Sequence, residues 1–181
     1  MKIKDFKELI EIPEGVDLVL DGQKITIKGK LGEVVKIYKM PRFVFAKEGK
    51  NLLITCNNYS VYDRRNLQTI KAHIKNMIQG ANEGFVYQLK ICASHFPMTV
   101  AVQGNKLSVK NLLGEKVPRV LDLKKNTKVE VKGDIIEVSG TDLELVSQQA
   151  GDIEQLTRIT NRDRRIFQDG IYIINKAGRA V

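Results

Sequence analysis

The sequence predicts an α+β protein made by tandem duplication of one small unit, in which a single helix packs on an antiparallel sheet. Three observations support this fold class. One stretch of sequence recurs 82 residues later, each copy opens with two alternating apolar strands, and each copy then carries one amphipathic helix. The chain has 181 residues, so each unit holds enough residues for a small core to form on its own.

The repeat is clearest between residues 16–33 and residues 98–115, which align without a gap. Six of the eighteen positions are identical: Gly22/Gly104, Lys24/Lys106, Lys28/Lys110, Leu31/Leu113, Gly32/Gly114 and Glu33/Glu115. Looser matches continue beyond this stretch, and they include Gly84-Phe-Val-Tyr with Gly170-Ile-Tyr-Ile. We therefore expect two related domains, residues 1–94 and residues 95–181.

Alternating apolar and polar residues predict the strands of each copy. Asp21-Gly22 and Gln103-Gly104 supply the tight turns of two hairpins, because glycine accepts a positive φ. Further strands are expected near residues 34–38, 44–47 and 52–56 in the first copy, and near residues 117–121, 128–132 and 135–139 in the second.

Apolar residues at spacings of three and four predict one helix in each copy. The first stripe comprises Leu67, Ile70, Ile74, Met77, Ile78 and Ala81, and the second comprises Val146, Ala150, Ile153, Leu156 and Ile159. Asp63 is a candidate N-cap of the first helix, and Thr141-Asp-Leu-Glu144 has the pattern of a capping box before the second. Gly151 should weaken the second helix by roughly 1 kcal/mol relative to alanine.

The composition points to a polyanionic partner. Lys plus Arg number 30 against 21 Asp plus Glu, a net charge of +9, which suits nucleic acid or acidic lipid. No apolar run approaches the roughly 18 residues of a membrane span, and the first residues do not form a signal peptide. The sequence contains no phosphate-binding loop, nucleophile elbow or zinc motif, so we expect no enzyme, no cofactor and no metal.

Arginine is concentrated in the second copy. Six of the nine arginines follow residue 118, and four of them lie in the segment 158–165: Arg158, Arg162, Arg164 and Arg165. Arginine binds phosphate in a bidentate manner, so this cluster is a candidate RNA contact. The alternative is a solvated turn whose charges are neutralised by Asp163 and Asp169.

Two further segments are candidate RNA contacts. Lys116 and Arg119 lie beside the bend at Gly114, although a plain strand connection explains this segment equally well. Lys176 and Arg179 belong to a short basic tail that could stay disordered until it binds phosphates. Aromatic residues form only 6% of the chain, so recognition of folded double-stranded RNA fits better than stacking on single-stranded bases.

Several ordered stretches resemble one protein family. They are Ile12-Pro-Glu-Gly-Val-Asp-Leu-Val-Leu, Asn76-Met-Ile-Gln-Gly80, Ser94-His-Phe-Pro97, Asn111-Leu-Leu-Gly-Glu-Lys116, Leu143-Glu-Leu-Val-Ser147 and Arg164-Arg-Ile-Phe-Gln-Asp-Gly-Ile-Tyr172. Together they are similar to the universal large-subunit ribosomal protein six family, which is eukaryotic large-subunit protein nine, in its archaeal and eukaryotic branch. The family fold is itself a tandem duplication of one α+β unit.

The resemblance implies a structural constituent of the cytoplasmic large ribosomal subunit. Family members bind rRNA near the base of the factor-binding stalk and the sarcin-ricin loop, mainly through the second domain, beside the neighbouring ribosomal proteins of the stalk base. Carried over to this sequence, the match implies rRNA contacts by Arg162, Arg164, Arg165, Lys116, Arg119, Lys176 and Arg179. The alternative function is a protein-interaction adaptor that binds no RNA.

Overall fold

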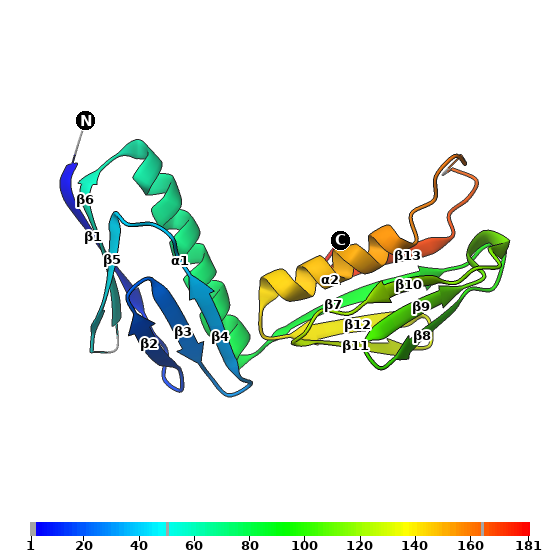
Figure 1. Ribbon diagram of the computed structural model, residues 1–181, viewed down its shortest axis with the longest axis horizontal. Helices are drawn as coiled ribbons and strands as arrows, with labels where there is room; N and C mark the ends of the chain where they lie inside the picture. The colour runs from blue at the N-terminus through cyan, green and yellow to red at the C-terminus, as the bar shows by residue number, and fades with distance from the viewer. Residues whose placement is uncertain (1–2, 50, 164) are drawn as a thin grey trace. The chain divides into compact units, whose positions relative to one another are not determined.

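The computed structural model describes residues 3–49, 51–163 and 165–181. The chain forms two compact units, unit 1 (Met1–Gly84) and unit 2 (Phe85–Val181). Each unit contains antiparallel sheets and one long helix (Figure 1), so the predicted α+β fold class is confirmed.

Unit 1 contains six strands followed by a helix. In chain order they are β1 (Ile3–Glu11), β2 (Asp17–Asp21), β3 (Lys24–Lys28), β4 (Glu33–Ile37), β5 (Phe43–Glu48), β6 (Asn51–Tyr59) and α1 (Val61–Asn82). The strands form two three-stranded sheets, with the orders β1-β6-β5 and β2-β3-β4. Helix α1 packs against β3, β4 and β6.

Unit 2 repeats this order and adds a final hairpin. Its elements are β7 (Phe85–Cys92), β8 (Thr99–Gln103), β9 (Lys106–Lys110), the 3-10 turn η1 (Leu112–Gly114), β10 (Arg119–Asp122), β11 (Thr127–Lys132), β12 (Ile135–Gly140), α2 (Leu143–Leu156), β13 (Gly170–Lys176) and β14 (Arg179–Ala180). The sheet orders are β11-β12-β7-β13-β14 and β10-β9-β8.

The division between the units lies ten residues before the boundary expected at residues 94 and 95. The strand β7 follows α1 in the chain, but it pairs with β12 and β13 and is therefore part of unit 2. The sequence match between Gly84-Phe-Val-Tyr and Gly170-Ile-Tyr-Ile is consequently a match between two neighbouring strands of one sheet.

The predicted hairpins form with one buried face each. Leu18 pairs with Ile27 in unit 1 and Val100 pairs with Val109 in unit 2, and Leu18, Ile27 and Val109 are buried. Gly22 and Gly104 have φ values of 58° and 60°, in the left-handed region that the two tight turns require. Alternation of buried and exposed residues along each strand therefore fixes the register.

The helices bury the predicted stripes but begin differently from the prediction. Ser60, and not Asp63, is the N-cap of α1, and Asp63 completes a capping box with it. Asp142 is the N-cap of α2, where its side chain accepts a hydrogen bond from the amide of Glu144. Helix α2 ends at Leu156, so Ile159 lies outside the helix.

Two glycines allow the packing and the propensity of the helices to be tested separately. At Gly29 a Cβ atom would lie 2.6 Å from the carbonyl oxygen of Ala81 in α1, whereas at Gly151 in α2 a Cβ atom would meet nothing within 4 Å. We expect Gly151→Ala to stabilise unit 2 by about 0.5–1 kcal/mol, because alanine restricts the unfolded chain and favours the helix.

Gly29→Ala should instead destabilise unit 1, because the backbone of α1 must move away from the new methyl group. Urea unfolding of both full-length variants, followed by circular dichroism, measures the two effects. Equal shifts of the same sign in the two variants would contradict this assignment.

Candidate nucleic-acid interface

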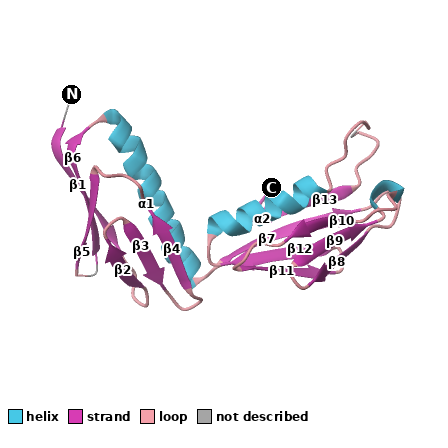
Figure 2. Ribbon diagram, viewed as in Figure 1, coloured by secondary structure: helices cyan, strands magenta, loops and turns pink. Residues whose placement is uncertain are grey.

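Three loops meet at one end of unit 2. They are the segments 93–98, 111–118 and 157–169, and the surface that they form, apart from residue 164, is called here the three-loop surface. Figure 2 shows η1 and the long loop after α2 at the same end of this unit. Hydrogen bonds join each of the three segments to the other two, directly or through Arg119.

A buried carboxylate ties the first loop to the third. Asp169 is 2% exposed and lies directly before β13. It accepts hydrogen bonds from the backbone amides of Ser94 (2.6 Å) and His95 (3.0 Å) and from the hydroxyl of Ser94 (3.1 Å). His95 Nδ1 lies 2.7 Å from Asp169 Oδ2, and it must carry a proton there because a carboxylate only accepts.

These hydrogen bonds keep Asp169 ionised. Burial by itself raises the pKa of this carboxyl group, but the amide and side-chain donors of His95 and Ser94 outweigh burial and lower the pKa from 3.8 to about 2. The sequence suggested that Asp169 neutralises the arginine cluster, and the structure shows that it is engaged by Ser94 and His95 instead.

A stack of side chains leads from Asp169 to the surface. The His95 ring stacks on Phe167, with centroids 4.8 Å apart and an angle of 26° between the rings. The guanidinium of Arg162 lies 4.9 Å from the centroid of Phe167. This cation–π contact orients an arginine that is otherwise exposed to solvent.

Arg119 joins the second loop to the end of α2. It donates two hydrogen bonds to the carboxylate of Glu115, at 2.5 and 2.9 Å. Its Nη1 donates to the carbonyl oxygens of Leu156, at 2.7 Å, and Arg158, at 3.1 Å. Leu156 is the last residue of α2, so Arg119 satisfies one carbonyl group that the helix leaves unpaired. The hydrogen bonds from Arg119 also lower the pKa of Glu115.

The second loop has an unusual backbone. Asn111, Leu113 and Gly114 have φ values of 61°, 50° and 81°. Leu113 is the least suited of the three to this region, so the turn stores strain that surrounding contacts must offset. One such contact is the hydrogen bond from Asn111 Nδ2 to the carbonyl oxygen of Pro97 in the first loop, at 3.0 Å.

The cations of the three-loop surface differ in their partners. Within the described part of the chain, three of them have no carboxylate partner, namely Lys116, Arg158 and Arg162. Arg165 pairs with Asp163 at 2.8 Å, and its side chain remains 89% exposed. Arg164 lies outside the described residues.

Lys176 and Arg179 lie elsewhere in unit 2. They face each other across the β13–β14 hairpin, where Ala177 and Gly178 form the turn. Gly170, the first residue of β13, pairs with Cys92, the last residue of β7, whereas Lys176 pairs with Tyr87 near the start of β7. The two cations therefore lie about 20 Å from the three-loop surface, at the other end of the strand. The basic tail forms an ordered hairpin.

Sequence reasoning missed the contribution of His95 and Phe167 to this site. Ser94 and His95 are 75 and 74 residues away from Asp169 in the chain, so no local pattern links them. The available signal was that Ser94-His-Phe-Pro97 and the segment from Arg164 to Tyr172 both carried the family resemblance. Arg158 belongs to the predicted arginine cluster but not to the predicted RNA contacts.

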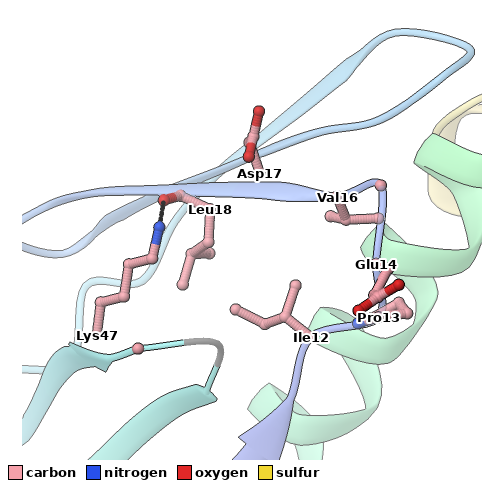
Figure 3. A pocket seen from close by; sticks show the side chains of 9 residues that line it. Ile12, Pro13, Glu14, Val16, Asp17, Leu18 and Lys47 are labelled. Atoms are coloured by element: carbon pink, nitrogen blue, oxygen red, sulfur yellow. Dashed lines mark hydrogen bonds between the residues drawn. The ribbon is translucent and has the colours of Figure 1, made fainter.

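Unit 1 contains a cavity of about 290 Å³ that lacks such a charged cluster. It lies between the β1–β2 connection and the β5–β6 hairpin (Figure 3). Ile12 and Leu18 point toward the space, whereas Asp17 points away from it. Lys47 donates a hydrogen bond to the carbonyl oxygen of Leu18 at 3.1 Å, so its ammonium group is already engaged. The cavity is accordingly a packing feature between two sheet ends.

The described residues lack the features of two other kinds of site. They contain no group of three or more His, Cys, Asp or Glu side chains placed to hold a metal ion. None of their helices has the length and apolar character needed to cross a membrane. On the three-loop surface of unit 2, exposed arginine and lysine side chains gather in one place, and such a cluster suits the binding of a polyanion.

Comparisons with known proteins identify the family. Residues 96–170 match the family model described as ribosomal protein L6. The chain is 40% identical over 170 residues to the large ribosomal subunit protein uL6 of Methanobrevibacter smithii and 41% identical to that of Haloarcula marismortui, covering 94% of this chain and 96% of each relative. The protein of the same name from Ignicoccus hospitalis is 40% identical, with 91% of both chains covered.

A protein with this degree of similarity over nearly its whole length is a ribosomal protein by descent. The chain belongs to the uL6 family, and the relatives described are archaeal, in agreement with the predicted branch. The uL6 family is a family of ribosomal proteins and not of enzymes.

The buried carboxylate makes the stability of unit 2 depend on pH. Because the pKa of Asp169 is about 2 in the folded protein and near 3.8 in the unfolded chain, its contribution is complete above about pH 5 and is lost as the pH falls through 2. We expect Asp169→Asn to cost about 2 kcal/mol at pH 7, with the difference from the wild type shrinking between pH 4 and pH 2.

Urea unfolding across this pH range measures the difference. Asp122→Asn is the matched control, because this carboxylate also belongs to unit 2 but its side chain is 78% exposed. A constant stability difference between the Asp169 variant and the wild type from pH 7 to pH 2 would refute the role assigned to the charge.

Proposed function

We propose that this protein is a structural constituent of the large ribosomal subunit and that it binds rRNA through the three-loop surface of unit 2. Membership of the uL6 family carries the ribosomal role. The position follows from the family resemblance: rRNA near the sarcin-ricin loop and the base of the factor-binding stalk, beside the neighbouring ribosomal proteins of that region. Unit 2 is then the main RNA-binding half.

The distribution of charge supports this choice of surface. Lys116, Arg158 and Arg162 present cations that have no carboxylate partner in the described structure. Each cation that meets a phosphate releases condensed counterions, so binding is driven largely by entropy and weakens with salt. Arg165 can exchange Asp163 for a phosphate at small cost, because a salt bridge this exposed contributes little to stability.

The remaining predicted residues take different roles in this proposal. Arg119 positions the loops, because its guanidinium donates four hydrogen bonds within the protein. Lys176 and Arg179 form a separate basic patch at the far end of β13, which could contact a second RNA segment. Arg164 stays a predicted RNA contact on the basis of the resemblance alone.

Removal of two unpaired cations should reduce the salt dependence of RNA binding. We expect the double variant Lys116→Ala, Arg162→Ala to lower the slope of log K against log salt concentration by about 1.5, at roughly 0.7–0.9 per phosphate contact. The measurement is a salt titration of full-length protein with an rRNA fragment that contains the sarcin-ricin loop and its neighbouring helices.

The matched control is Arg64→Ala, Lys75→Ala, which removes one arginine and one lysine from the exposed face of α1 in unit 1. This variant should keep the wild-type slope. If both double variants change the slope equally, binding depends on net charge alone and the three-loop surface is the wrong site.

Arg119→Ala should give the opposite result to the cation variants. It leaves the carbonyl groups at the end of α2 and the carboxylate of Glu115 without their donor, so unit 2 should lose about 1–3 kcal/mol of stability. At temperatures where the variant is folded, the salt slope should stay within experimental error of the wild type. A reduced slope with unchanged stability would make Arg119 a direct phosphate contact.

A further inference from the structure

In the described part of the chain, one sheet edge that a strand covers in unit 2 has no such cover in unit 1. The strand β1 lies at the edge of the order β1-β6-β5, whereas β7 lies inside the order β11-β12-β7-β13-β14. The strands β1 and β7 occupy equivalent positions in the two units. In unit 1 the buried residue Ile10 of β1 pairs with Leu52, which follows the hairpin turn at Gly49. In unit 2 the buried residue Leu89 of β7 pairs with Ile136, which follows the hairpin turn at Gly133 in the same way. The strand β13 covers the outer edge of β7, whereas no strand of the described chain covers the outer edge of β1.

Unit 2 shows how a strand covers the equivalent edge. The strand β13 runs antiparallel to β7, and it places Ile173 opposite Leu89 and Tyr172 opposite Lys90. The equivalent positions on β1 are Ile10 and Glu11. An unpaired edge exposes a row of backbone N–H and C=O groups that favour the addition of another strand.

The side chains of β1 favour one particular strand. Lys7, Leu9 and Glu11 alternate along its outer face, and Leu9 is 54% exposed. When two such strands pair antiparallel about Leu9, the lysine of each copy faces the glutamate of the other, and the two leucines meet. Opposite charges and apolar residues placed directly across a sheet stabilise the pairing. On the inner face, Glu8 is already paired with Lys71 of α1.

We propose that the free protein associates with a second copy of itself through antiparallel pairing of β1, with Leu9 at the twofold axis. A lysine on a sheet edge normally opposes such pairing, because it finds no partner across the strands. In this register it finds Glu11 of the second copy. The interaction uses only unit 1, and it goes beyond the proposed function because it requires no RNA.

Cross-linking tests the position of the contact. In nuclease-treated full-length protein with Cys92→Ser, the second cysteine, Cys56, is buried and only the introduced thiol is accessible. Leu9→Cys should give covalent dimers with a short bismaleimide at least about tenfold faster than Val19→Cys. Val19 is a matched control, because it is 51% exposed on a strand of the other sheet.

Charge reversal tests the register. Lys7→Glu puts two acidic pairs across the interface and should weaken association by about tenfold in sedimentation equilibrium. Adding Glu11→Lys to the same chain restores opposite charges at both pairs and should restore association. Both variants change exposed side chains, so neither should prevent folding.

Three results would overturn the proposal. They are cross-linking at Val19→Cys as fast as at Leu9→Cys, failure of the second charge change to restore association, and a chain that stays monomeric at about 0.1 mM. Cross-linking of position 9 to a different protein in purified large subunits, without any self-association, would assign the edge to another occupant. The salt titrations of RNA binding are independent of each of these outcomes.

Discussion

The buried carboxylate of Asp169 is the interaction on which the arrangement of unit 2 depends. A charge removed from water must be matched by donors, and here the donors come from a loop far away in sequence. The pairing of Cys92 with Gly170 places Ser94 and His95 near the start of β13, and their hydrogen bonds to Asp169 hold them there. His95 in turn stacks on Phe167, and Phe167 contacts the guanidinium of Arg162. The buried carboxylate of Asp169 therefore helps to position an exposed arginine.

Most of the fold could be predicted from the sequence because its signals are local. The hairpins at Gly22 and Gly104 need only a turn residue and alternating neighbours, and the stripes of the two helices need only their spacing. The position of β7 could not be obtained in this way. Its sequence reads as a strand that follows a helix, and only its pairing with β12 and β13 assigns it to the second unit.

The candidate interface was predicted in part for a similar reason. The number and position of the arginines are visible in the sequence, so the cluster around Arg162 could be found. Whether an arginine is available to a ligand depends on tertiary contacts, as Arg119 shows by donating to carbonyl oxygens at the end of α2. Lys176 lies near the cluster in sequence, but a strand of seven residues separates the two in space.

The central position of β7 also affects the order in which the two units complete their folding. Unit 1 has every strand of its sheets once its first 59 residues have been synthesised, and its helix follows directly. Unit 2 makes β7 first, yet one side of this strand waits for β13, whose residues lie about 80 positions later. Contacts between distant residues form slowly, and an open central strand invites wrong pairing meanwhile. The half of the chain that carries the cationic surface is therefore the half that finishes folding last.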